Sequence, residues 1–393
     1  MRLGDICSKI GSGATPRGGK EAYSTSGIPI IRSQNVLDWS FSSNGLAYLN
    51  DEQARTLSNV EVHQGDILLN ITGDSVARAC IVPDDVIPAR VNQHVAILRP
   101  KEKANATFIL AWLQTNKDLL LKLASSGATR NALTKRMLEG LDINLPSIDI
   151  QNHIAALISL IQSKINLNIK LNGYLEKLVS LEFSRRFKAS TPTIELGKVL
   201  SISTESIKPQ EHAGEIWEHY SIPAYDENRQ PLFELSDGIK SNKYAIDANC
   251  ILISKLNPAT KRIWMPSCTS EHSVCSTEFI VYKPKNPRYK SFYYAAIDSQ
   301  AFTDFLIAHV TGSTGSRQRT QPKATLTYPM PNPGHDAIEG FCAFANPIYK
   351  QIQSNKLESK WLVSLRDALL PKLMSGEIDV SKIDLTQLNS HLA

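Results

Sequence analysis

The sequence predicts an α+β (mixed α/β) protein built as an internal repeat, in which two globular units are each followed by a long amphipathic helix. The repeat is clearest in the four residues Leu-Val-Ser-Leu, which occur at 178–181 and again at 362–365 (362 − 178 = 184). The same offset aligns 65–69 with 249–253, Arg78 with Arg262 and Val95 with Phe279. Leu3-Gly4 and Leu196-Gly197 lie 193 apart (196 − 3 = 193), as loop insertions would allow. Two large, diverged copies in one chain predict a pseudo-two-fold molecule that meets a two-part partner.

Composition places the chain among ordinary globular proteins. Its 393 residues are enough for two or three domains, and 42% hydrophobic and 21% charged residues are typical of such proteins. The net charge of +5 (43 basic minus 38 acidic residues) permits nucleic-acid binding without requiring it. No apolar run approaches the ~18 residues that span a bilayer, and the N-terminus lacks a signal-peptide core. We therefore expect a cytoplasmic protein.

The six cysteines and nine histidines predict neither disulfides nor a metal site. No Cys-x-x-Cys spacing occurs, and the closest pair, Cys268 and Cys275, has no paired histidines downstream. The histidines do not form His-Glu-x-x-His or another ligand spacing. Reduced thiols in an intracellular protein are the expected state.

The two globular units are predicted at 1–147 and 191–333. In the first, short apolar and β-branched runs at 27–31, 66–69 and 95–98 lie between Gly, Asn and Asp turns, which is typical of strands. Helical periodicity from Thr107 to Leu123 predicts one helix there. The second unit repeats this pattern, with strands expected at 199–202, 250–253 and 279–282 and a helix at 291–309.

The long helices are predicted at 148–190 and within 334–393, the latter including a C-terminal tail. In the first, apolar residues recur every three or four positions, which is typical of an amphipathic helix of roughly 37 residues, or about 55 Å. Asp149 suits its N-cap, and Thr191-Pro192 stops it because proline cannot continue a helix. The second begins near Asp336 and ends at Ser375-Gly376, where glycine suits the left-handed position.

A heptad register that starts at Ile154 places matching residues on one face of both helices. Polar residues such as Asn168 and Asn355 interrupt the two stripes, and a polar seam residue fixes register and partner at a cost in stability. The alternative is two unrelated helices, each packed on its own unit. The residues predicted to pair the helices are Ile154, Leu157, Ile161, Asn168, Leu175 and Leu178 in the first helix and Phe341, Ile348, Ile352, Leu362 and Leu369 in the second.

No known catalytic or cofactor motif is present. The segment 11–18 is not Gly-x-Gly-x-x-Gly, and 14–21 lacks the first glycine and the Ser/Thr of a phosphate-binding loop. Asn346-Pro347-Ile348-Tyr349 differs from the Asn-Pro-Pro-Tyr loop of amino-methyltransferases and falls inside the second predicted helix. We therefore expect no covalent chemistry and no cofactor in this chain. A nuclease or methyltransferase with unrecognised motifs is the second interpretation, and a protein-binding scaffold without DNA contacts is the third.

Polar, glycine-rich segments recur at matching places in both units and favour nucleic-acid binding. Arg, Gln and Asn side chains read base edges by paired hydrogen bonds, whereas Ser, Thr and Lys position phosphates. Glycine lets backbone N–H groups approach a phosphate closely. Arg130 and Arg317 are the best individual candidates, because each follows a Gly/Ser/Thr run at the corresponding place. For any single loop, a solvated turn is the competing interpretation.

The candidate DNA-binding residues fall into one set for each unit. Those of the first unit are Thr15, Arg17, Arg32, Gln34, Asn35, Arg78, Asn92, Gln93, Thr129, Arg130, Lys135 and Arg136. Those of the second unit are Lys255, Asn257, Lys261, Arg262, Thr277, Ser313, Arg317, Gln318, Arg319 and Lys323.

The order of globular unit, helix, globular unit, helix resembles, over the whole chain, the specificity (S) subunit of type I restriction–modification systems. The most specific local match is 369–378, Leu-Leu-Pro-Lys-Leu-Met-Ser-Gly-Glu-Ile, which is similar to the family's usual ending of the distal helix. The openings at 3–5 and 196–198, the segment 65–68 and Gly-Ala-Thr at 127–129 also resemble the family. The second unit departs from the pattern where Asn249-Cys250 replaces Gly-Asp.

The resemblance implies a non-catalytic subunit that recognises double-stranded DNA. Its globular units would be target-recognition domains, each binding one half of an asymmetric, interrupted target. Its long helices would pair as an antiparallel coiled coil that acts as a spacer and docks two methyltransferase (M) subunits. Those partners would carry S-adenosylmethionine and modify adenine, and restriction (R) subunits would add cleavage that depends on ATP and Mg.

Overall fold

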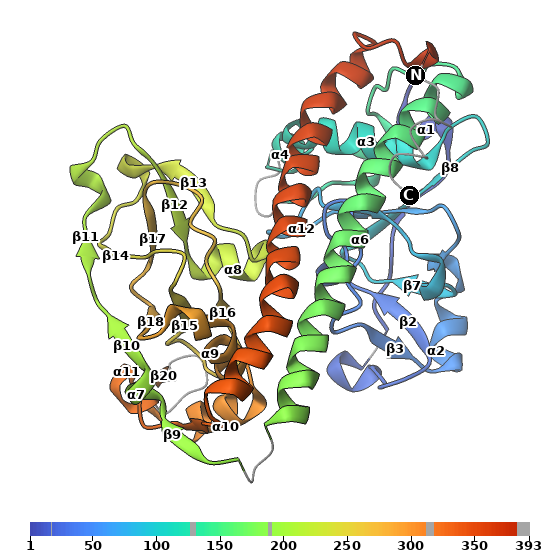
Figure 1. The fold of residues 1–393 in the computed structure, drawn as a ribbon. Helices are drawn as coiled ribbons and strands as arrows, with labels where there is room; N and C mark the ends of the chain where they lie inside the picture. Colours follow the sequence, from blue (N-terminus) through green and yellow to red (C-terminus); the bar gives the residue numbers. More distant parts are fainter. Residues whose placement is uncertain (17, 126–130, 188–190, 312–317, 383–393) are drawn as a thin grey trace. The chain divides into compact units, whose positions relative to one another are not determined.

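The structure, a computed structural model, describes residues 1–16, 18–125, 131–187, 191–311 and 318–382. They divide into two compact units, one from the described residues of Met1–Asn166 and Ser359–Ala393 and one from Leu167–Glu358. Each unit contains a globular α+β body and a segment of each long helix, α6 (Ile148–Arg186) and α12 (His335–Ser375) (Figure 1). No helix among the described residues is both long enough and apolar enough to cross a membrane. The predicted combination of mixed α/β units with two long helices is confirmed.

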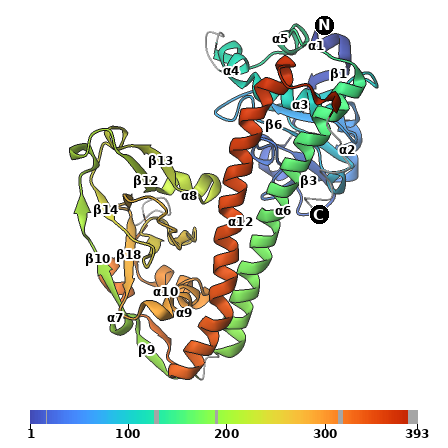
Figure 2. The same cartoon turned by 45° about the horizontal axis from the view of Figure 1, so that its top comes forward.

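The body of the first unit consists of two four-stranded sheets and short helices (Figure 2). One sheet is antiparallel and has the order β1 (Cys7–Ser12), β8 (Val95–Pro100), β5 (Ile67–Asn70), β6 (Ala79–Ile81). The other has the order β3 (Ala47–Leu49), β2 (Ile28–Ile31), β7 (Ala89–Val91), β4 (Glu61–Val62), and β2 runs parallel to β7. The helices are α1 (Leu3–Ile6), α2 (Asp51–Thr56), α3 (Ala106–Thr115), α4 (Lys117–Ser125) and α5 (Lys135–Glu139).

The second unit repeats this plan with additional strands. Its antiparallel sheet has the order β10 (Leu200–Ser203), β18 (Phe279–Pro284), β15 (Ile251–Ser254), β16 (Ile263–Trp264). Its mixed sheet has the order β11 (Ser206–Ile207), β14 (Lys243–Ala245), β17 (Ser273–Ser276), β12 (Ile216–Tyr220), β13 (Leu232–Leu235). Two short pairs join β9 (Thr193–Glu195) to β21 (Pro329–Pro331) and β19 (Val310–Thr311) to β20 (Arg319–Thr320). The helices are α7 (Leu196–Val199), α8 (Ile222–Asn228), α9 (Lys290–Ile297), α10 (Gln300–Ala308) and α11 (Pro322–Thr325).

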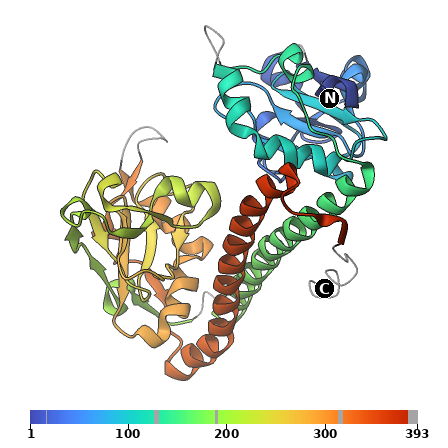
Figure 3. The ribbon, with the colours of Figure 1, turned by 90° about the horizontal axis from the view of Figure 1, so that it is seen from above.

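Each antiparallel sheet lies between two apolar cores, because successive side chains along a strand point to opposite faces of the sheet. In the first unit, Ile67 and Leu69 pack against α3 and the helix segments, whereas Leu68 packs against the second sheet. In the second unit, Ile251 and Ile253 pack against α9 and the helix segments, and Leu252 faces the other way. Figure 3 shows α9 and α10, in orange, beside the helix segments of that unit.

The sequence offset of 184 is preserved in the pairing of the strands. Ile67 pairs with Leu98 in the first unit, and Ile251 pairs with Tyr282 in the second. The parallel pairing of β2 with β7 recurs between β12 and β17. Between β1 and β10, the strands that open the two sheets, the offset in residue number changes from 193 to 192. Lys9 of β1 corresponds to Ser201 of β10 (201 − 9 = 192). A register irregularity between Cys7 and Lys9 in β1 accounts for this one-residue difference.

The helices predicted at 107–123 and 291–309 are wrong as single helices, because each is two helices in the structure. α3 ends at Asn116, whose side chain donates to the Trp112 carbonyl at 2.9 Å. α10 begins after Ser299, whose hydroxyl accepts from the backbone N–H of Phe302 at 3.2 Å. Such short polar side chains end one helix and cap the next, while the apolar spacing continues across the break. Periodicity alone therefore did not reveal the break.

Within each unit the segments of α6 and α12 run antiparallel. In the first unit, Ile161 and Ile165 pack against Leu362, and Arg366 donates to the Gln162 side-chain oxygen at 2.7 Å. In the second unit, Asn168 donates to Glu358 at 2.7 Å, and Asn355 donates to the Asn172 side-chain oxygen at 2.8 Å. Contact positions in α12 fall as those in α6 rise, which is the antiparallel arrangement that the resemblance implied.

Most residues that were predicted to pair the helices are buried or half-buried, but Leu178 is a correction. Ile154, Leu157, Ile161, Asn168, Leu175, Phe341, Ile348, Ile352, Leu362 and Leu369 lie in or beside buried clusters of their own unit. Leu178 is 47% exposed, and its neighbour Val179 is buried instead. The buried row Ile158, Ile165, Asn172 and Val179 keeps the seven-residue period, so the seam uses the position after Leu178 and not Leu178 itself.

Candidate nucleic-acid interface

Five polar loops that are far apart in the sequence meet at one end of the first unit. Backbone hydrogen bonds join them: Ala14 N–H to the Val91 carbonyl (3.0 Å) and Asn92 N–H to the Ile31 carbonyl (2.9 Å). Ile71 N–H donates to the His94 carbonyl (3.0 Å), and Leu133 N–H donates to the Ile71 carbonyl (2.8 Å). We call residues 13–16, 32–36, 71–78, 92–94 and 131–136 the loop end of the first unit. The structure thus brings together the nine DNA-binding candidates of the first unit that lie within the described residues.

Gly13 shows why this junction needs glycine. A Cβ atom at this position would lie 1.9 Å from the Val91 carbonyl oxygen, far inside van der Waals contact. The close approach lets the Gly13 N–H donate to the Val95 carbonyl at 2.9 Å, next to the Ala14 bond. Gly13 therefore ties the loop after β1 to the start of β8.

Six of the predicted DNA-binding residues have exposed side chains at this loop end. They are Thr15, Gln34, Arg78, Gln93, Lys135 and Arg136. Arg78 makes no ion pair with any residue that the structure describes, whereas Lys135 lies 3.5 Å from Glu139. Such Arg, Gln and Lys side chains have the donors and acceptors that base edges and phosphates require.

The other described candidates of the first unit hold the loops in place. The buried Asn35 amide donates to the carbonyls of Ser42 (2.8 Å) and Asn44 (3.2 Å), and Arg32 donates to the Gly45 carbonyl at 2.5 Å. The Asn92 side chain, also buried, accepts from the His94 N–H at 3.1 Å. Asn35 and Asn92 are therefore positioning residues in this structure, not free hydrogen-bonding groups.

His94 belongs to the loop end and was missed by sequence reasoning. Its Nδ1 lies 2.7 Å from the Thr72 hydroxyl, and its Nε2 lies 3.4 Å from the Gln93 amide nitrogen. The pair joins two loops through side chains that can each donate and accept. The signal was the adjacency of His94 to Asn92-Gln93, but the prediction favoured Arg, Gln and Asn over histidine.

The second unit builds its loop end on the same backbone frame. Lys255 N–H donates to the Glu278 carbonyl (2.8 Å), which repeats the bond from Ile71 to His94 184 residues later. Asn257 N–H donates to the Gln318 carbonyl (3.0 Å), as Gly73 does to Asn131 (3.3 Å). Asn257 and Gly73 both adopt positive φ, at 50° and 77°. We call residues 255–262, 276–278 and 318–323 the loop end of the second unit.

The side chains on the shared frame differ between the two units. Lys255 is the second unit's equivalent of Ile71. Its side chain donates to the Thr277 carbonyl at 2.6 Å and lies over the Tyr244 ring. Burial lowers the pKa of Lys255. At the position of His94, Glu278 lies 3.3 Å from Arg319. Arg319 and Lys323 are exposed, whereas Asn257, Thr277 and Gln318 are half-buried.

Two candidates of the second unit are held by acidic residues. Arg262 binds Asp226 through two hydrogen bonds of 2.6 and 2.8 Å, and Lys261 lies 2.7 Å from Asp298. Arg262 corresponds to the exposed Arg78, so the same position is structural in one unit and available in the other. The candidates Arg17, Thr129, Arg130, Ser313 and Arg317 lie outside the described residues.

Comparisons with known proteins agree with this fold. Residues 1–177 match the family described as type I restriction modification DNA specificity domain. The S subunit of a type I restriction–modification system from M. genitalium has a similar structure, with 14% identity, a TM-score of 0.56, and 95% of each chain covered. The HsdS subunit from Thermoanaerobacter tengcongensis matches with 16% identity, a TM-score of 0.35, and 96% of each chain covered. The first 177 residues therefore match a type I restriction–modification DNA specificity domain, and the chain has a fold similar to that of the M. genitalium S subunit.

Proposed function

We propose that this chain is the non-catalytic DNA-specificity subunit of a type I restriction–modification complex. Each unit binds one half of a bipartite double-stranded DNA target at its loop end. The observation that carries the proposal is the shared backbone frame, which presents different polar side chains at equivalent positions of the two units. A repeated frame fits two similar docking events, and different side chains fit two different base sequences.

The exposed residues divide by the contacts they suit. Arg78 and Gln93 in the first unit and Arg319 in the second have side chains that recognise base edges by paired hydrogen bonds. Thr15, Lys135 and Lys323 suit phosphate oxygens, which fix position without reading sequence. Because the two sets are not equivalent, the proposed target is asymmetric and not a palindrome.

The long helices supply the spacer and the docking surface for methyltransferase subunits. In the second unit, α6 exposes a row of large apolar side chains with 39–61% of each side chain accessible: Leu167, Leu171, Tyr174, Leu178 and Leu181. Their spacing of three and four residues puts them on one face of the helix. An exposed apolar row of this kind fits a protein partner. The proposed partners are two M subunits, which bring S-adenosylmethionine, and R subunits, which bring ATP and Mg chemistry.

Methylome mapping tests the proposal directly. The chain is expressed with its M partner in a host without adenine methylation, and methylated adenines are mapped along the host DNA. The expected result is a motif of two unlike parts separated by a gap of fixed length. A continuous short motif would contradict the proposal. So would methyl transfer by the purified chain alone, since the proposal assigns that chemistry to M.

A further inference from the structure

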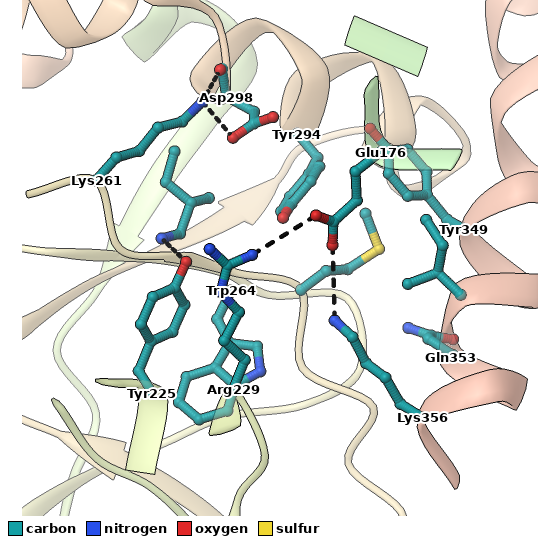
Figure 4. Close-up of a pocket in the computed structure, with 13 residues that line it drawn as sticks. Glu176, Tyr225, Arg229, Lys261, Trp264, Tyr294, Asp298, Tyr349, Gln353 and Lys356 are labelled. Atoms are coloured by element: carbon teal, nitrogen blue, oxygen red, sulfur yellow. Dashed lines mark hydrogen bonds and ion pairs between the residues drawn. The ribbon is translucent and has the colours of Figure 1, made fainter. Parts of the chain in front are cut away.

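A polar cavity of about 250 Å³ lies inside the second unit, between the globular body and the segments of α6 and α12. Its walls come from the end of α8, the start of β16, the end of α9 and the two helix segments. Figure 4 shows the Glu176 carboxylate between Arg229 and Lys356, with Tyr294 and Tyr349 nearby. Of the residues that line the cavity, only Lys261 also lies in the loop end of the second unit.

Three of the charged groups around the cavity, Glu176, Arg229 and Lys356, are poorly satisfied by the protein, whereas Lys261 and Asp298 pair at 2.7 Å. Glu176 lies 3.6 Å from Arg229 and 3.9 Å from Lys356, beyond hydrogen-bond distance in both cases. Neither cation donates a side-chain hydrogen bond to any described residue, and the hydroxyls of Tyr294 and Tyr349 also lack a described partner. Burial lowers the pKa of Lys356 and raises the pKa of Asp298, which Lys261 opposes. The unused groups are mainly donors, so the cavity favours an acceptor-rich ligand.

Charge, shape and size define the class of ligand. Three cations (Arg229, Lys261, Lys356) and two carboxylates (Glu176, Asp298) line the cavity, which leaves one positive charge (3 − 2 = 1). A guanidinium matches a carboxylate through two parallel hydrogen bonds. Trp264, Tyr294 and Met265 provide flat apolar walls. The volume is below the roughly 300–1,000 Å³ of sites for drug-sized ligands, so it suits a single ring.

We propose that this cavity binds a small aromatic carboxylate, with the carboxylate on Arg229 and Lys356 and the ring against Trp264 and Tyr294. The ligand would join the globular body of the second unit, through Arg229, to α12, through Lys356. This proposal does not depend on DNA binding, because the two proposed carboxylate partners, Arg229 and Lys356, lie outside the loop end of the second unit.

Calorimetric titration of the full-length chain with benzoate tests the site, with acetate and inorganic phosphate as comparison ligands. We expect saturable binding of benzoate with a Kd on the order of 1 mM or tighter, and at least about tenfold weaker binding of acetate, which has no ring. Equal affinity for all three anions would mean nonspecific charge attraction and would overturn the proposal. Absence of saturable benzoate binding would do the same.

Variants separate the site from general electrostatics. Arg229→Gln and Lys356→Gln should each weaken benzoate binding by about tenfold or more, because each removes one carboxylate partner. Glu176→Gln should strengthen it, since the competing carboxylate is removed. Lys350→Gln, an exposed lysine on the same helix and outside the cavity, is the matched control. An equal loss in Lys350→Gln and Lys356→Gln, with unchanged thermal unfolding of both variants, would contradict the assignment.

Discussion

At the scale of single residues, the repeat uses equivalent positions for different purposes. Asp66 is fully buried and binds Arg99 through two hydrogen bonds of 2.8 Å, while also accepting from the His63 N–H. At the equivalent positions the second unit has Cys250 and Lys283, and Lys283 lies near Asp247 instead. The departure from Gly-Asp that the sequence showed at 249–250 is therefore the loss of one buried ion pair. The strand it supports keeps the same register.

Arg78 and Arg262 give the sharpest residue-scale prediction, because they occupy the same position in the two repeats. Arg78→Gln should weaken binding to duplex target DNA and leave unfolding unchanged, since the side chain is exposed and makes no ion pair with a described residue. If Arg78 contacts a phosphate, the slope of log Kd against log salt concentration should fall by about 1. Binding measured by fluorescence anisotropy at several salt concentrations checks this.

The matched change in the other repeat should act on stability. Arg262→Gln breaks the two hydrogen bonds to Asp226, and the Arg262 side chain is only 14% exposed. We expect a loss of about 1–3 kcal/mol in the unfolding free energy of the second unit, measured by urea denaturation. An Arg262→Gln variant of normal stability would contradict the structural role of Arg262. An Arg78→Gln variant of reduced stability would contradict a role of Arg78 in DNA contact alone.

At the scale of elements, the polar seam between α6 and α12 is a built structural feature of the second unit. The Asn355 side chain donates to Asn172 and accepts from Gln351, at 2.8 Å each, and Asn355 is only 4% exposed. Asn355→Leu should destabilise this unit by about 1–3 kcal/mol, because it leaves the buried Asn172 oxygen without that donor. The double variant Asn172→Leu, Asn355→Leu should recover most of the loss. Urea denaturation measures both, with the exposed Ser354→Ala as control.

The exposed row on α6 gives a second element-scale prediction. Leu171→Glu and Leu178→Glu place charges on side chains that are 39% and 47% exposed, so the chain should fold normally. Assembly with the M subunit should fall by at least about tenfold, because a buried interface excludes an unpaired charge. Size-exclusion chromatography with the M partner measures this. The control is Lys170→Glu, which changes an exposed residue next to this face and should assemble normally. An equal loss of assembly in all three variants would indicate nonspecific charge effects.

Helices and strands could be predicted where a local apolar pattern marks them. Helix ends could not be predicted where a capping side chain sets them. The strands near 66–69 and 250–253 followed directly from their apolar runs, and the structure places β5 and β15 there. Leu178 failed because the seam uses the next position of each heptad, where Ile165, Asn172 and Val179 are buried. The loop ends could be predicted as polar segments. The inward turn of Asn35 and the use of His94 depend on contacts with residues far away in sequence, which no local pattern contains.

At the scale of the whole molecule, the proposed function makes half-site recognition and spacing separable properties. The side chains at the loop ends differ between units, whereas the paired helices carry none of the exposed candidates for DNA contact. Exchanging loop-end residues should therefore change one half of the target, and changing the helices should change only the gap. This division follows from the proposed function and is open to a direct test.

Inserting one heptad into both α6 and α12, at facing positions, is that test. Seven residues extend a helix by about 10.5 Å, which corresponds to roughly three base pairs, and a whole heptad keeps the apolar seam in register. We expect methylome mapping with the M partner to show the same two half-sites, separated by a gap about three base pairs longer. A four-residue insertion is the control, because it rotates the seam and should reduce folding or assembly. An altered half-site with an unchanged gap would exclude the helices as the spacer.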